Sequence, residues 1–163
     1  MNLVYLGLGS NLSDPLQQIH QAILKISAHS DLNILAYSSL YISQPMGPQD
    51  QPEYFNAVLK INTLLKPIAL LDKLQAIENI TGRVRKDQRW EARIIDIDIL
   101  LYNNEVIKND RLTIPHYGLQ EREFVVIPLT EIDNQLQLPD GQSIAILAKT
   151  IATNDLKIHS QLG

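Results

Sequence analysis

The sequence contains no cysteine, so disulfide bonds, thiolate metal sites and cysteine nucleophiles are excluded. It also contains no window that approaches the roughly 18 apolar residues needed to span a bilayer. Residues 1–6 lack the basic start and the long apolar stretch of a secretory signal. We therefore expect a cytoplasmic protein that has no membrane partner.

Positive charge is scarce as well. The chain has 14 lysine and arginine residues against 18 aspartate and glutamate residues, and its net charge is -4. A general nucleic-acid or membrane binder is usually basic, so this balance argues against both classes. With 163 residues, of which 45% are hydrophobic, the chain has enough material for one globular core. No repeat or linker divides it, and we expect a single domain over residues 1–163.

Apolar periodicity predicts the order strand, helix, strand, strand, helix, strand. The strands are expected at residues 3–8, 33–43, 54–62 and 94–102, and the helices after Asp14, from Pro67 to Gly82, at 119–132 and at 143–152. This order is typical of a ferredoxin-like α+β sandwich, in which an antiparallel-rich sheet carries helices on one face.

Three connecting segments have their own signals. Gly7 to Asn11 is interpreted as a tight turn, because it lacks the lysine and the spacing of a phosphate-binding loop. Residues 44–53 are rich in proline and lack apolar periodicity, so they are expected to form a long loop. Asn103 and Asn104 are expected to turn the chain into a short strand at 105–107.

The strand at 54–62 alternates in a way that predicts its orientation. Phe55, Ala57 and Leu59 fall on one side, and Tyr54 and Asn56 fall on the other. The first set should face the core. The other sheet face, with Tyr54 and Asn56, should be open to a ligand.

Asp96 and Asp98 are the sharpest local signal. Residues two apart on a strand point the same way, so both carboxylates can grip one or two hard cations. The cation expected here is magnesium bound together with a phosphate chain. Leaving two carboxylates unpaired among isoleucines would otherwise be costly. The alternative is an edge strand whose two aspartates are simply solvated.

A basic segment precedes this strand directly. Residues 82–93 contain five cations and two acids around Trp90. Arginine forks match phosphate oxygens, and the indole can stack on a flat ring. A solvated loop and a nucleic-acid patch are the alternatives. Its position next to the carboxylate pair favours phosphoryl-type transfer, which needs mainly positioning and charge neutralisation.

Six ordered blocks of the sequence resemble the 6-hydroxymethyl-7,8-dihydropterin pyrophosphokinase family. They comprise residues 8–12, 47–56, 82–86, 93–99, 112–117 and 122–125. The resemblance implies a ferredoxin-like monomer that transfers pyrophosphate from ATP to the pterin in folate biosynthesis. It also implies two magnesium ions, and no nucleic-acid partner.

The resemblance assigns roles to individual positions. It places Asp96 and Asp98 on the metal, and it makes them catalytic together with Arg83 and Arg93. It places nine residues around ATP, namely Gln75, Glu78, Arg85, Lys86, Ile99, Arg111, His116, Tyr117 and Arg122. It places seven around the pterin, namely Ser43, Pro45, Met46, Tyr54, Asn56, Trp90 and Phe124.

Two other functions remain open. A non-catalytic ferredoxin-like module could use the basic segment on RNA, and its binding would depend on salt but not on Asp96. A magnesium-dependent nucleotidyltransferase could use the same aspartate pair, and it would release pyrophosphate rather than AMP from ATP.

Overall fold

The computed structural model describes residues 1–12, 14–43, 53–81, 85–86, 89–90 and 94–162, with the backbone alone at 85–86 and 89–90. Its main sheet has six strands, and all of their pairings are antiparallel. Five strands follow the order β10 (Lys157–Ser160), β3 (Leu40–Ser43), β4 (Tyr54–Thr63), β1 (Asn2–Ser10) and β7 (Asp96–Tyr102). The sixth, β2 (Asn33–Tyr37), also pairs with β4. This order places β7 and β10 at opposite edges.

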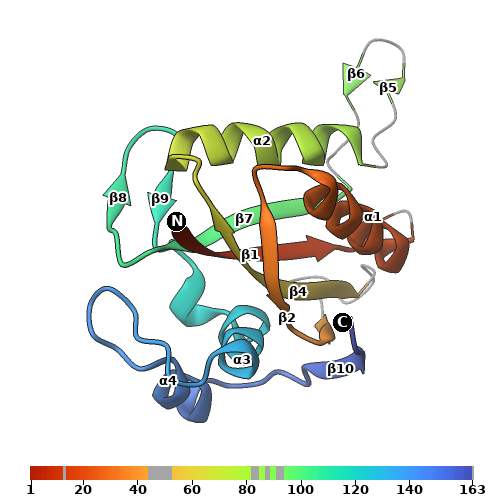
Figure 1. Cartoon of the computed structure of the whole chain (residues 1–163). Coiled ribbons are helices and arrows are strands. Elements are labelled where there is room, and N and C mark those ends of the chain that lie inside the picture. The colour runs from red at the N-terminus through yellow and green to blue at the C-terminus, as the bar shows by residue number, and fades with distance from the viewer. Residues whose placement is uncertain (13, 44–52, 82–84, 87–88, 91–93, 163) are drawn as a thin grey trace.

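Helices cover both faces of the sheet (Figure 1). On one face lie α1 (Pro15–Ala28) and α2 (Pro67–Ile80), which pack against Leu6 and Leu59. On the other lie α3 (Glu123–Ile132) and α4 (Ile144–Thr150), which pack against Tyr5 and Val58. The α+β sandwich is confirmed, but the expectation of helices on one face is wrong. Tyr5 and Val58 present apolar surface on the second face, and a second layer of helices is needed to bury it.

The expected helix starts are confirmed where the sequence carries capping residues. The Asp14 carboxylate accepts a hydrogen bond from the backbone N–H of Gln17 at 3.4 Å, and Pro15 opens α1. Pro67 opens α2, although no side chain caps that helix. Ser143 caps α4 through the N–H of Ile146.

Several boundaries differ from the expectation. The segment 33–43 forms two strands, because Ser38 leaves the ladder and exchanges two hydrogen bonds with Val58. The segment 119–132 contains a 3-10 turn, η1 (Leu119–Glu121), before α3, and Pro128 lies inside α3 without ending it. The strand expected at 105–107 is β8 (Ile107–Lys108), which pairs with β9 (Thr113–Ile114).

Three short strands were not expected. Within the basic segment, β5 (Arg85–Lys86) pairs with β6 (Arg89–Trp90). The polar tail forms β10, which extends the main sheet at β3. Polar composition concealed β10, because an edge strand can face water on most of its surface.

Glu131 joins α3 to the break between β2 and β3. Its carboxylate accepts hydrogen bonds from the Ser39 backbone N–H at 2.8 Å and from the Tyr41 hydroxyl at 2.9 Å. The Ser39 hydroxyl donates a third at 2.5 Å. Burial and the neighbouring carboxylate raise the pKa of Tyr41, so its phenol remains a donor at neutral pH. One side chain therefore satisfies three polar groups where the strand ladder is interrupted.

We predict that Glu131→Ala lowers the free energy of unfolding by about 2–3 kcal/mol, because it removes three hydrogen bonds to a charged acceptor. Glu131→Gln should lose less, since one acceptor oxygen remains. Urea unfolding measures both values. Glu121→Ala, at another exposed glutamate, serves as the control and should change stability by less than about 0.5 kcal/mol. Equal losses at the two positions would contradict a role for Glu131 in holding α3.

Candidate active site

A cavity of about 310 Å³ opens on the sheet face that α3 partly covers. We call it the sheet cavity. Strands β1, β3, β4 and β7 contribute to it, and residues at the start of α3 form one wall. Its lining comprises Gly7, Leu8, Gly9, Ser43, Tyr54, Asn56, Ala57, Asp96, Asp98, Leu100, Arg122, Phe124 and Val125. The structure thus brings together seven residues to which the family resemblance assigns metal, ATP or pterin binding. They are Ser43, Tyr54, Asn56, Asp96, Asp98, Arg122 and Phe124.

Two glycines of β1 line the sheet cavity between the aspartates and the amide of Asn56. Gly9 is the register partner of Asp96 in β7 and of Asn56 in β4, and Gly7 is the partner of Asp98. A Cβ atom on Gly9 would lie 3.2 Å from Asn56 Oδ1. The interpretation of residues 7–11 as a tight turn is therefore wrong for the glycines. Glycine inside a strand often marks a close approach, and that signal could have identified this surface.

Asp96 and Asp98 point into the sheet cavity, while Ile97 and Ile99 point into the core against α1 and α2. Asp96 is exposed, and the side chain of Asp98 is 45% exposed. The carboxylates are therefore not buried among the isoleucines, and β7 is an edge strand. Both can take part in ion binding at little desolvation cost, because water already reaches them.

Two side-chain hydrogen bonds support the backbone of β7 beside the two aspartates, one from α2 and one from the end of β1. The Glu78 carboxylate is buried and accepts the Ile97 N–H at 2.7 Å, between Asp96 and Asp98 in sequence. The Ser10 hydroxyl donates to the Ile94 carbonyl at 2.6 Å, just before the strand. Glu78, expected at a nucleotide, thus holds the backbone that carries the carboxylate pair.

Asn56 is buried on the expected side of β4. Its Nδ2 donates to the Ser43 hydroxyl at 2.8 Å, which fixes the amide across the gap between β4 and β3. Tyr54 and Phe124 line the same cavity. An oriented amide with aromatic neighbours suits a flat, polar-edged ring.

Arg122 lies close to two aromatic rings. Its guanidinium carbon is 5.4 Å from the centre of the Tyr117 ring and 5.8 Å from that of Phe124. Gly118 makes room for this arrangement, since a Cβ there would lie 2.6 Å from Arg122 Nε. The exposed Tyr117 ring also stacks on His116 with 4.6 Å between ring centres. Positive charge is therefore held at the cavity wall by ring contacts.

His116 faces the carboxylate pair. Its Nδ1 accepts the Gly118 N–H at 3.2 Å, so the neutral ring carries its hydrogen on Nε2, which lies 3.7 Å from Asp98 Oδ2. Burial lowers the pKa of His116, Asp98 opposes that effect and Arg122 adds to it. At neutral pH the ring is thus an uncharged donor directed toward Asp98.

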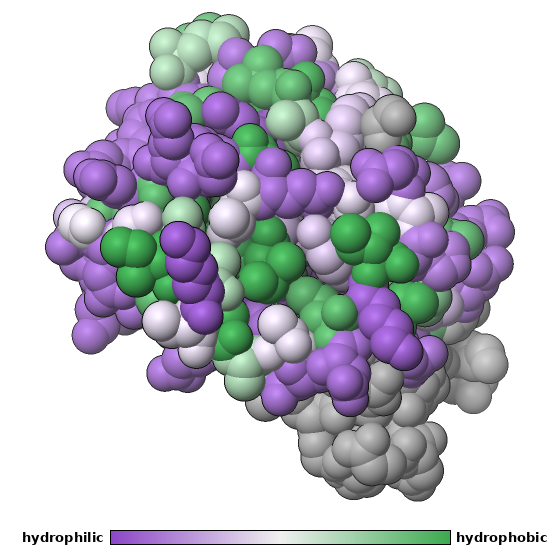
Figure 2. Space-filling model, turned by 90° about the horizontal axis from the view of Figure 1, so that it is seen from below, coloured by the Kyte–Doolittle hydropathy of each residue, from purple (hydrophilic) through white to green (hydrophobic). Residues whose placement is uncertain are grey.

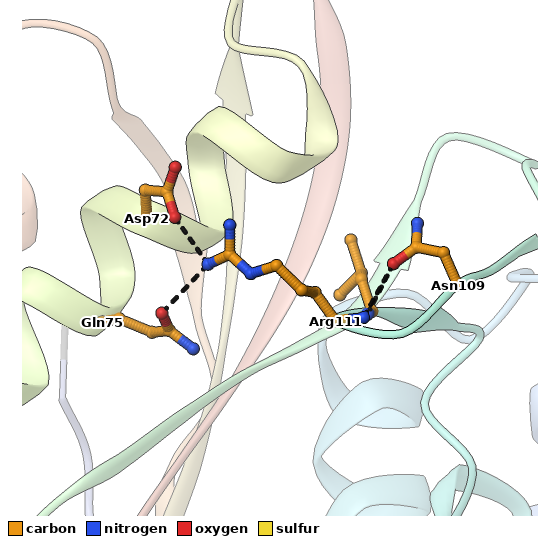
Figure 3. Close-up of polar contacts among 5 residues, drawn as sticks. Asp72, Gln75, Asn109 and Arg111 are labelled. Carbon is orange, nitrogen blue, oxygen red and sulfur yellow. Dashed lines mark hydrogen bonds and ion pairs between the residues drawn. The ribbon is translucent and has the colours of Figure 1, made fainter.

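Gln75 and Arg111 meet on the α2 side of the molecule (Figure 3). Arg111 Nη2 donates to Gln75 Oε1 at 3.2 Å and forms an ion pair with Asp72 Oδ1 at 2.6 Å. Neither Gln75 nor Arg111 lines the sheet cavity. Asp72 was not expected here, because only the tertiary fold brings it to Arg111.

The remaining predicted residues fall into two groups. The side chain of Ile99 is 3% exposed and lies in the core, so only its backbone can contact a ligand. The side chains of Arg85, Lys86 and Trp90, and all of Pro45, Met46, Arg83 and Arg93, lie outside the described residues.

Residues 5–134 match the family described as 7,8-dihydro-6-hydroxymethylpterin-pyrophosphokinase. The chain belongs to this family. A 2-amino-4-hydroxy-6-hydroxymethyldihydropteridine pyrophosphokinase of Haemophilus influenzae is 53% identical over 156 residues, covering 96% of this chain and 97% of the relative. Enzymes of the same description from Pseudomonas aeruginosa and Bacillus subtilis are 46% and 40% identical, over 86% and 83% of this chain and 86% and 81% of their own lengths.

The family's fold is confirmed by solved structures. The chain superimposes with a TM-score of 0.72 on a structure described as HPPK-DHPS in complex with substrates. The two share 15% sequence identity, and the match covers 92% of this chain and 45% of that longer chain. This likeness confirms the ferredoxin-like α+β class.

We predict that Gly9→Ala weakens binding of the pterin named by the family by about tenfold. The added methyl group would press on Asn56, which Ser43 holds in place, and overpacking of this kind costs about 1–3 kcal/mol. Titration with the pterin measures the effect.

Gly7→Ala is the matched control. Its methyl group would meet the Leu100 side chain at 3.3 Å and not Asn56, so pterin binding should change by less than about threefold. Similar losses in both variants would contradict a specific role for the space above Gly9.

Proposed function

We propose that ATP donates the pyrophosphate that this chain transfers to 6-hydroxymethyl-7,8-dihydropterin in folate biosynthesis, and that magnesium is required. Family membership supports the transfer reaction. The observation that supports the assignment to this site is the convergence of the Asp96–Asp98 pair with Asn56 in one cavity.

The donor set suits magnesium. Asp96 and Asp98 supply two accessible carboxylates on one side of a strand. Among the described residues, no group of three or more histidine, aspartate or glutamate side chains could hold a metal alone. Magnesium is commonly held by one or two carboxylates with substrate phosphates completing its coordination. Two bound ions would neutralise charge on the phosphate chain.

Residues around the aspartate pair suit a polyphosphate. Arg122 offers a guanidinium close to two aromatic rings, and His116 offers an uncharged N–H donor. Tyr117 extends this wall, and Arg111, in the connection between β8 and β9, contacts Gln75 on α2. Arg83 and Arg93 are proposed to stabilise charge on the transferred group, with Arg85 and Lys86 nearby in the sequence.

The other end of the sheet cavity suits the pterin. The Asn56 amide can donate to and accept from the ring edge, and Tyr54 and Phe124 offer aromatic faces. Ser43 fixes the orientation of that amide. Trp90 and the backbone near Pro45 and Met46 are proposed to complete the enclosure.

The proposed step is an in-line displacement. The hydroxymethyl oxygen of the pterin attacks the β-phosphorus of ATP, and the bond from that phosphorus to the bridging oxygen of the α-phosphate breaks. AMP leaves with the electron pair, and the hydroxyl proton is released. Among the described side chains, Asp96 and Asp98 would hold the magnesium, Asn56 would position the pterin and Arg122 would stabilise charge.

We also propose that residues 1–163 form one domain that acts as a cytoplasmic monomer. Pairing of β10 with β3 supports the first part, since it joins the chain's end to the main sheet. Figure 2 shows small apolar patches separated by hydrophilic groups on the α3 and α4 side, which is typical of a surface that faces water. No helix in the described part of the chain is long and apolar enough to cross a membrane.

Product analysis with ATP, magnesium and the pterin tests the function. We expect AMP and pterin diphosphate in equal amounts. Asp96→Asn and Asp98→Asn should each lower turnover at least about a hundredfold, because each weakens metal binding. Asp155→Asn makes the same charge change beside β10, at the opposite edge of the sheet, and should retain activity.

The other outcomes separate the competing functions. Release of pyrophosphate from ATP would instead identify a nucleotidyltransferase. Salt-sensitive RNA binding that survives Asp96→Asn, without AMP formation, would identify a binding module. Full turnover by Asp98→Asn with magnesium present would exclude the metal assignment.

A further inference from the structure

Asp72 and Arg111 form an ion pair that the proposed mechanism does not use. Arg111 lies in the connection between β8 and β9, and Asp72 lies on α2. Figure 3 shows that both interactions of the guanidinium with α2 end on the same nitrogen. Asp72 Oδ1 is 2.6 Å from Nη2, and Gln75 Oε1 is 3.2 Å from it. The contact is not the two-pronged pairing that makes an arginine–carboxylate pair strong.

This pair lies along the same helix that braces the aspartate strand. Gln75 and Glu78 are three residues apart on α2 and therefore share a face. Glu78 holds the Ile97 N–H, while Gln75 accepts from Arg111. Arg111 therefore contacts α2 one to two helical turns, roughly 5–9 Å of rise, from Glu78. A nucleotide whose phosphates reach Asp96 and Asp98 would have to extend around the edge strand β7 toward α2 to contact Arg111.

Both members of the pair are accessible to an incoming anion. The side chains of Arg111 and Asp72 are 45% and 59% exposed. Exposed ion pairs are weak, so phosphate can replace the carboxylate at small cost. The Asp72 carboxylate itself repels a polyanion at short range.

We propose that Asp72 is an affinity-determining residue that competes with the nucleotide for the Arg111 guanidinium. In the free enzyme Asp72 neutralises Arg111. When the nucleotide binds, its anionic oxygens take over the guanidinium. Asp72 therefore lowers nucleotide affinity and favours release of the spent nucleotide. This inference rests on the proposed function, because it takes ATP as the ligand.

The test is the equilibrium affinity of Asp72→Asn for magnesium-ATP, measured by calorimetry without pterin. The substitution keeps the shape of the side chain and removes its charge. We expect the Kd to fall about two- to fivefold, the range that corresponds to loss of an exposed ion pair. The gain should shrink as ionic strength rises, because both groups are exposed. If Asp72 had only a structural role, Asp72→Asn would weaken binding of magnesium-ATP or leave it unchanged. Either result would overturn the proposal.

Two further variants isolate the pair. Arg111→Ala should weaken binding, and Asp72→Asn should then add little in that background. If Asp72→Asn raised the affinity equally in the wild-type and the Arg111→Ala protein, the proposal that Asp72 competes for Arg111 would be overturned. Asp155→Asn has the same charge change at the opposite sheet edge and should leave the Kd unaltered.

The two proposals fail in different ways. If the wild-type protein bound magnesium-ATP but formed no AMP with the pterin, the proposed function would fail. If it formed AMP but Asp72→Asn gained no affinity, only the role of Asp72 would fail.

Discussion

The pairing of β7 with β1 is the interaction on which the rest of the site depends. It places Asp96 and Asp98 opposite Gly9 and Gly7, so no side chain of β1 fills the space beside the carboxylates. Because β7 is an edge strand, its outer backbone needs partners from elsewhere, and Glu78 supplies one at Ile97. The strand that carries the charged pair is therefore held from both sides.

One face of the sheet contributes the larger core, and the other carries the candidate site. Leu6, Leu59 and Ile97 pack under α1 and α2 and form the larger core. The other face is covered by α3 and α4 over Tyr5 and Val58, and the sheet cavity opens beside that cover. A rigid, apolar layer behind the strands keeps the polar groups in front of it in fixed positions.

Much of this arrangement could be predicted from local sequence. The two-residue period placed Asp96 and Asp98 together, and it placed Asn56 on the ligand side of β4. The split at Ser38 and the strand β10 could not be predicted, because each depends on hydrogen bonds to residues far along the chain. The aspartates are not buried among the isoleucines, because side chains alternate across the strand and the isoleucines take the core side.

The family, the order of the main elements and the carboxylate pair can all be predicted from the chain's amino acids, because periodicity and motif spacing are local properties. Which distant groups meet depends instead on the three-dimensional fold. The pairs Glu78–Ile97, Asn56–Ser43 and Arg111–Asp72 join segments that no repeat or spacing relates. The physical reason is that a polar side chain bonds to whatever donor or acceptor packing places within about 3 Å of it, and packing is a property of the whole fold.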